Sequence, residues 1–154
     1  MIPDAGYPSN VVCMPAIFPE GSCGPVVDID VRVIAEHVFI GDLVMYVHSP
    51  YLQQALILDI PGIAQPDSSD LWPDAPILFD DNADVPSDFM GEDCGEFEAV
   101  CLEGMNICSY APYPDPLALI TPPDPVGVWE FCIADDNPGN VGTLIGAEFI
   151  ITTD

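Results

Sequence analysis

Strict alternation of apolar and charged residues gives the clearest structural signal in the chain. Residues 27–33 read Val-Asp-Ile-Asp-Val-Arg-Val, so the aliphatic side chains share one face and the charged ones share the other. A period of two over this length predicts a half-buried β-strand. A Gly41-Asp42 turn separates it from a second predicted strand over residues 43–48, which Ser49-Pro50 ends.

The rest of the chain repeats this pattern of short strands and turns. Further strands are predicted over residues 55–60, 76–79, 128–133 and 142–151, each bounded by Pro, Gly, Asn or Asp. The 18 prolines argue against long helices. Residues 65–76 read as a loop rich in Pro and Asp, and the proline-rich residues 111–125 are expected to run extended along the surface. The pattern predicts an all-β, antiparallel sandwich in a single domain.

Charge narrows the classes of partner. The chain has 26 Asp and Glu against one Lys or Arg, for a net charge of −25. That balance excludes a nucleic-acid partner and an anionic membrane surface, both of which need a basic face. No apolar stretch is long enough for membrane insertion. A hydrophobic fraction of 49% distinguishes the chain from acidic disordered proteins. The excess negative charges should repel one another and destabilise the folded chain. We therefore expect divalent cations or high ionic strength to stabilise it.

Cysteine usage predicts an oxidising environment. Neither a Cys-x-x-Cys nor a Cys/His zinc pattern occurs, so disulfides are the better interpretation. They imply an extracellular or cell-surface location. Of the fifteen possible connectivities, the short-loop choice pairs Cys13 with Cys23 and Cys94 with Cys101, leaving Cys108 with Cys132. All six cysteines are then used: Cys13, Cys23, Cys94, Cys101, Cys108 and Cys132.

Catalytic residues are hard to find. The two histidines, His37 and His48, have no Ser or Cys near them in a recognisable nucleophile motif. The chain also lacks Gly-x-Ser-x-Gly and His-Glu-x-x-His. We therefore expect structural or surface roles for both histidines and no enzyme activity.

Several motifs together resemble one family. Residues 28–50 run from the alternating strand through Glu36-His37-Val38-Phe39 to Gly41-Asp42-Leu43 and end at Ser49-Pro50. This segment closely resembles the P domain (P/Homo B domain) of kexin- and furin-like proprotein convertases and many bacterial secreted enzymes. Other similar motifs follow the family's order: Ile2-Pro3-Asp4, Phe79-Asp80-Asp81, Tyr113 to Leu117, Gly127-Val128-Trp129-Glu130-Phe131, Ala134-Asp135-Asp136 and Gly142-Thr143-Leu144.

The resemblance spans residues 1–154 and implies a non-catalytic, jelly-roll-like β-sandwich of about eight strands, often Ca²⁺-binding in its bacterial forms. The chain departs from the family at three places. Its corner is Glu36-His37-Val38-Phe39 and not His-Thr-Tyr, Ala147 stands where the family usually has Trp, and residues 91–110 look like a disulfide-rich insertion.

Calcium is the expected cofactor. Ca²⁺ takes six to eight oxygen ligands, which sandwich loops can supply by gathering carboxylates from separate turns. Asp is also a common turn former, so a purely structural role for the same residues stays open. The candidate ligands are Asp42, Asp80, Asp81, Asp84, Asp135 and Asp136.

These observations predict a secreted structural domain that self-associates as a homo-oligomer or filament. The chain has no Lys with which to guard sheet edges. Expected contacts are the N-terminal residues 1–25 and the insertion, although Val11 and Val12 also fit a strand that completes its own sheet. The alternatives are an accessory domain attached to a secreted protease or other hydrolase, and a carbohydrate-binding module with a glycan ligand.

Overall fold

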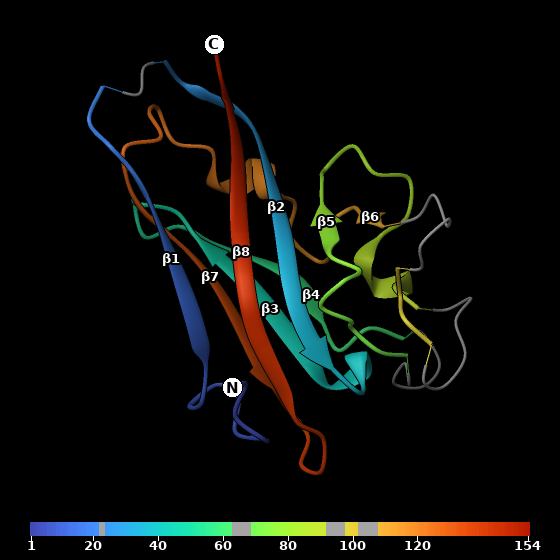
Figure 1. The fold of residues 1–154 in the computed structure, drawn as a ribbon. Coiled ribbons are helices and arrows are strands. Elements are labelled where there is room, and N and C mark those ends of the chain that lie inside the picture. Colours follow the sequence, from blue (N-terminus) through green and yellow to red (C-terminus); the bar gives the residue numbers. More distant parts are fainter. Residues whose placement is uncertain (22–23, 63–68, 92–97, 102–107) are drawn as a thin grey trace.

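Two four-stranded sheets form the part of the protein that the structure describes. The structure, a computed structural model, describes residues 1–21, 24–62, 69–91, 98–101 and 108–154. One sheet, the β7 sheet, has the order β1-β7-β3-β4, and the other, the β2 sheet, has the order β6-β5-β2-β8 (Figure 1). The strands are β1 (Val12–Phe18), β2 (Val26–His37), β3 (Leu43–His48), β4 (Gln54–Asp59), β5 (Ile77–Phe79), β6 (Ser109–Tyr110), β7 (Gly127–Asp135) and β8 (Gly142–Thr153).

The predicted all-β, jelly-roll-like sandwich in one domain is confirmed. Five strand pairs are antiparallel, and the chain passes repeatedly from one sheet to the other. The exception to the antiparallel prediction is the short pair β5–β6, which runs parallel. Every strand predicted from the hydrophobic pattern is present, and β2 continues to His37 because alternation persists beyond Val33.

Three single 3₁₀ turns complete the described secondary structure: η1 (Ile40–Asp42), η2 (Ser87–Phe89) and η3 (Leu117–Ile120). The turn η3 corrects the prediction that residues 111–125 simply run extended. Leu117 and Ile120 are buried, because the turn lets both side chains reach the core. No described helix is long and apolar enough to cross a membrane.

Aromatic side chains fill the space between the sheets. Trp129 and Phe131 project inward from β7, Phe79 projects from β5, and all three are fully buried. The rings of Trp129 and Phe149 on β8 lie 5.8 Å apart, so this contact joins the two sheets. Trp129 Nε1 donates a hydrogen bond to the Pro125 carbonyl, which satisfies its one buried polar group.

The N-terminal stretch completes its own sheet. β1 pairs with β7 from Val12 opposite Ile133 to Phe18 opposite Gly127. Val12 therefore lies in a strand of the same molecule, as the alternative expected, and Val11 directly precedes that strand. Ile17 remains 75% exposed on the outer side.

The disulfides differ from the predicted pairing. The β1–β7 register sets Cys13 directly opposite Cys132, with Cα atoms 4.1 Å apart, and the two are bonded. A second bond joins Cys101 to Cys108. The predicted pairs Cys13–Cys23, Cys94–Cys101 and Cys108–Cys132 are therefore wrong, because each includes a cysteine with another partner. Cys23, Cys94 and most of the 91–110 segment lie outside the described residues.

Candidate functional site

A buried histidine–aspartate pair lies where β2, η1 and the end of β7 meet. His37 Nε2 is 3.2 Å from Asp135 Oδ2, and both side chains are fully buried. The other ring nitrogen, Nδ1, lies 2.9 Å from the Phe39 carbonyl oxygen and 3.2 Å from the Phe39 nitrogen. Both imidazole nitrogens therefore face protein groups, which suits a structural histidine better than a general base.

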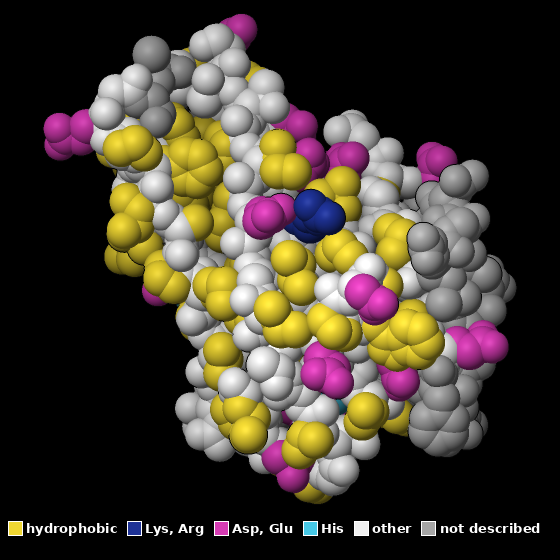
Figure 2. Space-filling view, in the orientation of Figure 1, with side chains coloured by type: hydrophobic (Ala, Val, Ile, Leu, Met, Phe, Trp, Pro, Cys, Tyr) yellow, Lys and Arg dark blue, Asp and Glu magenta, His cyan; other side chains and the backbone are white. Residues whose placement is uncertain are grey.

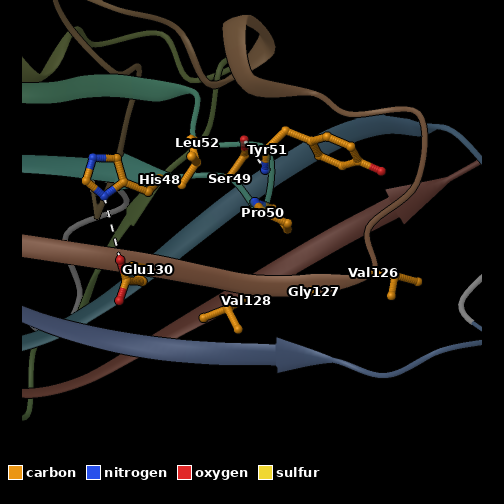
Figure 3. Close-up of a pocket in the computed structure, with 9 residues that line it drawn as sticks. All are labelled: His48, Ser49, Pro50, Tyr51, Leu52, Val126, Gly127, Val128 and Glu130. Carbon is orange, nitrogen blue, oxygen red and sulfur yellow. Dashed lines mark hydrogen bonds and ion pairs between the residues drawn. The ribbon is translucent and has the colours of Figure 1, made fainter.

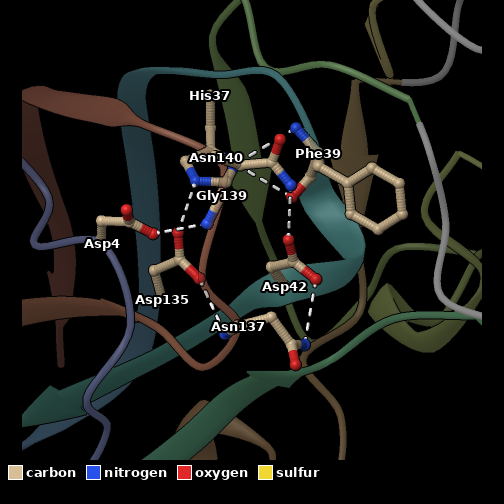
Figure 4. Close-up of polar contacts among 8 residues, drawn as sticks. All are labelled: Asp4, His37, Phe39, Asp42, Asp135, Asn137, Gly139 and Asn140. Carbon is tan, nitrogen blue, oxygen red and sulfur yellow. Dashed lines mark hydrogen bonds and ion pairs between the residues drawn. The ribbon is translucent and has the colours of Figure 1, made fainter.

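Amide side chains surround the neighbouring carboxylate. Asp42 Oδ1 accepts a hydrogen bond of 3.0 Å from Asn137 Nδ2, and Asp42 Oδ2 accepts one of 2.8 Å from Asn140 Nδ2. Gly139 N donates to Asp4 Oδ1 at 2.8 Å. Figure 4 shows these groups converging, and we call them the polar corner: Asp4, His37, Phe39, Asp42, Asp135, Asn137, Gly139 and Asn140.

Burial and hydrogen bonding act on Asp135 in opposite directions. Burial raises the pKa of Asp135, and the nearby Asp42 carboxylate adds to the rise. Hydrogen bonds from the Asn137 N–H and from His37, together with the charge of His37, lower it. The Asn137 N–H donates to Asp135 Oδ1 at 2.9 Å. The corner thus holds its carboxylates with N–H donors.

The other predicted calcium ligands lie apart from the polar corner or at its edge. Asp81 accepts hydrogen bonds from the Leu117 and Ala118 N–H groups, at 2.7 and 2.8 Å, so it caps η3. Asp80 Oδ1 accepts from the Asn82 N–H at 2.7 Å in a local turn. Asp84 is exposed. Asp136 is half-buried, and its backbone N–H donates to the Asp42 carbonyl.

The Asp30 carboxylate on β2 has fewer hydrogen-bond partners than the carboxylates of the polar corner. Asp30 Oδ1 is buried without a hydrogen-bond partner. Burial, followed by the negative charges of Asp80, Asp28 and Asp81, raises the pKa of Asp30 to about 6. We call Asp28, Asp30, Asp80 and Asp81 the acidic strand cluster. Sequence reasoning missed Asp30 because it fitted the alternation simply as an outward-facing residue.

Nothing in the described part of the chain tests calcium binding directly. Within those residues, no three His, Cys, Asp or Glu side chains meet in an arrangement that could hold a metal ion. Calcium at the six aspartates stays a prediction.

The outer face of the β2 sheet carries exposed apolar side chains between charged ones. Ile145 and Ile150 on β8 are 48% and 49% exposed, and Ile34 on β2 packs over Gly146. A shallow hollow of about 420 Å³ continues this surface, lined by Arg32, Pro76, Leu78, Cys108, Ser109 and Ile150. Figure 2 shows hydrophobic side chains gathered over this face. We call it the outer β2 face.

The only basic side chain of the protein lies in the middle of the outer β2 face. Arg32 Nη1 is 3.4 Å from Glu148 Oε2 on the paired strand β8, and both side chains are about half exposed. Figure 2 shows the Arg32 side chain beside an acidic one and among hydrophobic ones. Arg32 offsets the charge of Glu148 at this point, while Asp30, which lies opposite Ile150 on the same face, adds negative charge beside the pair.

The similarities that comparison with known proteins finds are to solved structures. No family model matches the chain, and no curated protein does. Among solved structures, the chain is similar to one described as the crystal structure of Aeromonas sobria serine protease (ASP) and the chaperone (ORF2) complex. The TM-score is 0.44 at 12% identity, over 99% of this chain. The chain spans about a fifth of that solved chain, 21% of its length.

Proposed function

We propose that this protein is a non-catalytic, secreted interaction domain that self-associates through the outer β2 face. The supporting observation is the exposed apolar surface around a neutral Arg32–Glu148 pair. In this proposal, a second copy of the same chain binds to the outer β2 face. The two disulfides fit a secreted protein.

Electrostatics favours this face over the rest of the surface for contact between copies. Two chains of charge −25 repel each other, and Arg32 reduces this repulsion locally by offsetting the charge of Glu148. Salt screens the repulsion between charges that lie more than about 8 Å apart at physiological ionic strength. A stable contact would bury on the order of 1,000 Å² or more.

The strand arrangement adds a second route to contact. β8 lies at the edge of its described sheet, with β2 as its neighbour, and runs for 12 residues. Long edge strands expose unpaired backbone groups, and monomeric proteins commonly protect them with Lys, which this chain lacks. Face and edge together provide a continuous surface for a second copy.

Sedimentation velocity of the purified chain at increasing protein and salt concentration tests the proposal. We expect association to increase with salt and Ile150→Asp to abolish it. Ile17→Asp is the matched control, because Ile17 is an exposed isoleucine of the other sheet. If Ile17→Asp dissolves the assembly and Ile150→Asp does not, the contact runs through β1 instead. A protein that stays monomeric throughout overturns self-association and makes the accessory-domain and glycan-binding alternatives the ones to test.

A further inference from the structure

A second surface feature lies on the opposite sheet. A hollow of about 470 Å³ opens between the β3–β4 turn and the start of β7. Figure 3 shows its lining residues from both segments: His48, Ser49, Pro50, Tyr51, Leu52, Val126, Gly127, Val128 and Glu130. We call it the turn pocket. Neither the polar corner nor the outer β2 face includes it.

The β3–β4 turn is held in an uncommon conformation. Ser49 Oγ accepts hydrogen bonds from the Tyr51 and Gln53 N–H groups, both at 3.3 Å. Leu52 has a φ of 60°, which is rare for a residue other than glycine, and its side chain is 91% exposed. Non-glycine residues held in such a sparsely populated conformation cluster at ligand-binding sites.

A glycine fixes the other wall of the pocket. Gly127 has a φ of 126°, and a Cβ atom there would lie 2.7 Å from Pro50 Cβ. The start of β7 can therefore approach the turn closely only with glycine at this position. This approach sets Val128, which is 47% exposed, beside the turn.

The polar groups of the pocket favour a cation. The Glu130 side chain is 44% exposed, and its carboxylate lies 3.8 Å from His48 Nδ1, farther than a hydrogen bond. His48 Nε2 lies 3.1 Å from Gln54 Oε1, which fixes the orientation of the ring. Glu130 thus keeps acceptor capacity for an incoming donor.

A second carboxylate lies at the edge of the pocket. Asp124 accepts a hydrogen bond of 3.0 Å from the Tyr51 hydroxyl. This bond, with burial and the Asp124 charge, raises the pKa of Tyr51. Burial, then the nearby Tyr7 and Glu130, raises the pKa of Tyr46. Asp124 and Glu130 therefore contribute two negative charges near the pocket.

We propose that the turn pocket binds a lysine or arginine side chain presented by a different protein. The aliphatic part of that side chain would pack on Leu52 and Val128, and its cationic head would bind the Glu130 carboxylate. A different protein is the better source because this chain has a single such residue, Arg32, which already pairs with Glu148. A net charge of −25 also attracts a basic partner over long distances.

NMR titration of the ¹⁵N-labelled chain tests this inference. The probes are the blocked tripeptides Gly-Arg-Gly and Gly-Lys-Gly, and the control is the same peptide with neutral citrulline in the central position. At physiological salt, we expect the amide signals of Leu52, Gly127 and Val128 to shift with the cationic peptides. Citrulline peptide should bind at least tenfold more weakly.

Matched variants separate the pocket from general attraction to an acidic protein. Glu130→Gln should weaken binding at least tenfold, whereas Glu36→Gln, which removes the same charge from an exposed position of β2 on the opposite sheet, should leave it unchanged. Leu52→Ala should weaken binding severalfold, and Leu119→Ala, at another exposed leucine, should not. Equal binding of citrulline and arginine peptides, or equal loss in both glutamate variants, overturns the proposal.

A further comparison tests the source of the cation. If Glu130→Gln and Arg32→Gln each abolish self-association in sedimentation velocity, the occupant is Arg32 of a second copy and the inference of a different protein is wrong. If self-association is unaffected by Glu130→Gln while peptide binding is lost, the pocket acts independently of the outer β2 face, as proposed.

Discussion

The polar corner and the acidic strand cluster use the same residue type with different hydrogen-bond partners. In the polar corner, Asp42 and Asp135 are almost completely buried, yet each accepts hydrogen bonds from nearby N–H groups. In the acidic strand cluster, Asp30 is less buried but has an oxygen without a partner and three carboxylates nearby. Burial raises the pKa of both Asp135 and Asp30, and at Asp135 the hydrogen bonds from Asn137 and His37 offset part of this rise.

Removing the Asp135 carboxylate from the polar corner should cause the largest loss of stability. Asp135→Ala leaves His37 Nε2 and the Asn137 N–H without their acceptor in a buried site. We expect a loss of about 3 to 5 kcal/mol in the free energy of unfolding, measured by urea denaturation. Asp136→Ala, at the half-buried neighbour, is the control and should cost much less. Similar losses in both variants would contradict the special role of the buried pair.

Asp42→Ala should break the same corner less severely. It removes the acceptor of two side-chain amides, Asn137 Nδ2 and Asn140 Nδ2, both of which can turn toward water. The expected loss is about 1 to 2 kcal/mol. Asp84→Ala, which removes an exposed carboxylate, should be neutral in the same assay. A neutral Asp42→Ala would show that the amides gain nothing from this acceptor.

Asp30→Asn should stabilise the fold, whereas the two variants of the polar corner destabilise it. The pKa of Asp30 is raised from 3.8 to about 6, so the folded protein binds this proton more tightly than the unfolded chain does. The charged form therefore costs stability above pH 6, and that cost disappears as the pH falls from 6 toward 4. We expect the variant to be more stable at pH 8 by about 1 kcal/mol after allowing for solvent screening.

Thermal unfolding of the native chain and the Asp30→Asn variant between pH 4 and pH 8 checks this. The difference in melting temperature should be greatest at pH 8 and shrink below pH 6. Asp28→Asn removes a neighbouring charge from the same strand and should give a smaller gain. A constant difference across the range would show that titration of Asp30 is not its cause.

Calcium should produce the smallest change in the free energy of unfolding. Ca²⁺ binding only to the folded state at Asp80 and Asp81 would raise the free energy of unfolding by about 1 kcal/mol or less at a few times its Kd. Calorimetry with CaCl₂ against NaCl of equal ionic strength separates binding from screening. Asp80→Asn with Asp81→Asn should remove any specific part. Equal melting temperatures in the two salts would mean that screening is the whole effect.

The sequence predicted those parts of the fold that depend on neighbours along the chain. β3 occupies the predicted residues 43–48, since its alternation and the Ser49-Pro50 stop are local signals. The inward position of His37 was also readable, because it continues the alternation of Val31, Val33 and Ala35. Its partner Asp135 was not readable, because it lies 98 residues away and comes close only when the sheets pack.

The disulfide pairing also depends on contacts between residues that are distant in sequence. Short loops favoured Cys13–Cys23, but the first and seventh strands pair in a register that sets Cys13 against Cys132, 119 residues away. No local pattern encodes that register. The roles of Asp81 and Asn140 depend in the same way on segments that are distant in sequence. A run such as Asp-Asp-Asn-Pro-Gly-Asn at residues 135–140 was the available signal for the amide donors of the polar corner.

The position of Arg32 determines how the protein resists trypsin-like proteases. Trypsin-like enzymes cut after Lys or Arg, and Arg32 is the one such residue in the chain. Its backbone lies in β2 between β8 and β5, opposite Glu148 on one side and Leu78 on the other. A protease cannot draw this segment into its cleft without dismantling the β2 sheet. A single tryptic cut therefore reports global unfolding, and its rate measures how often the whole sandwich opens.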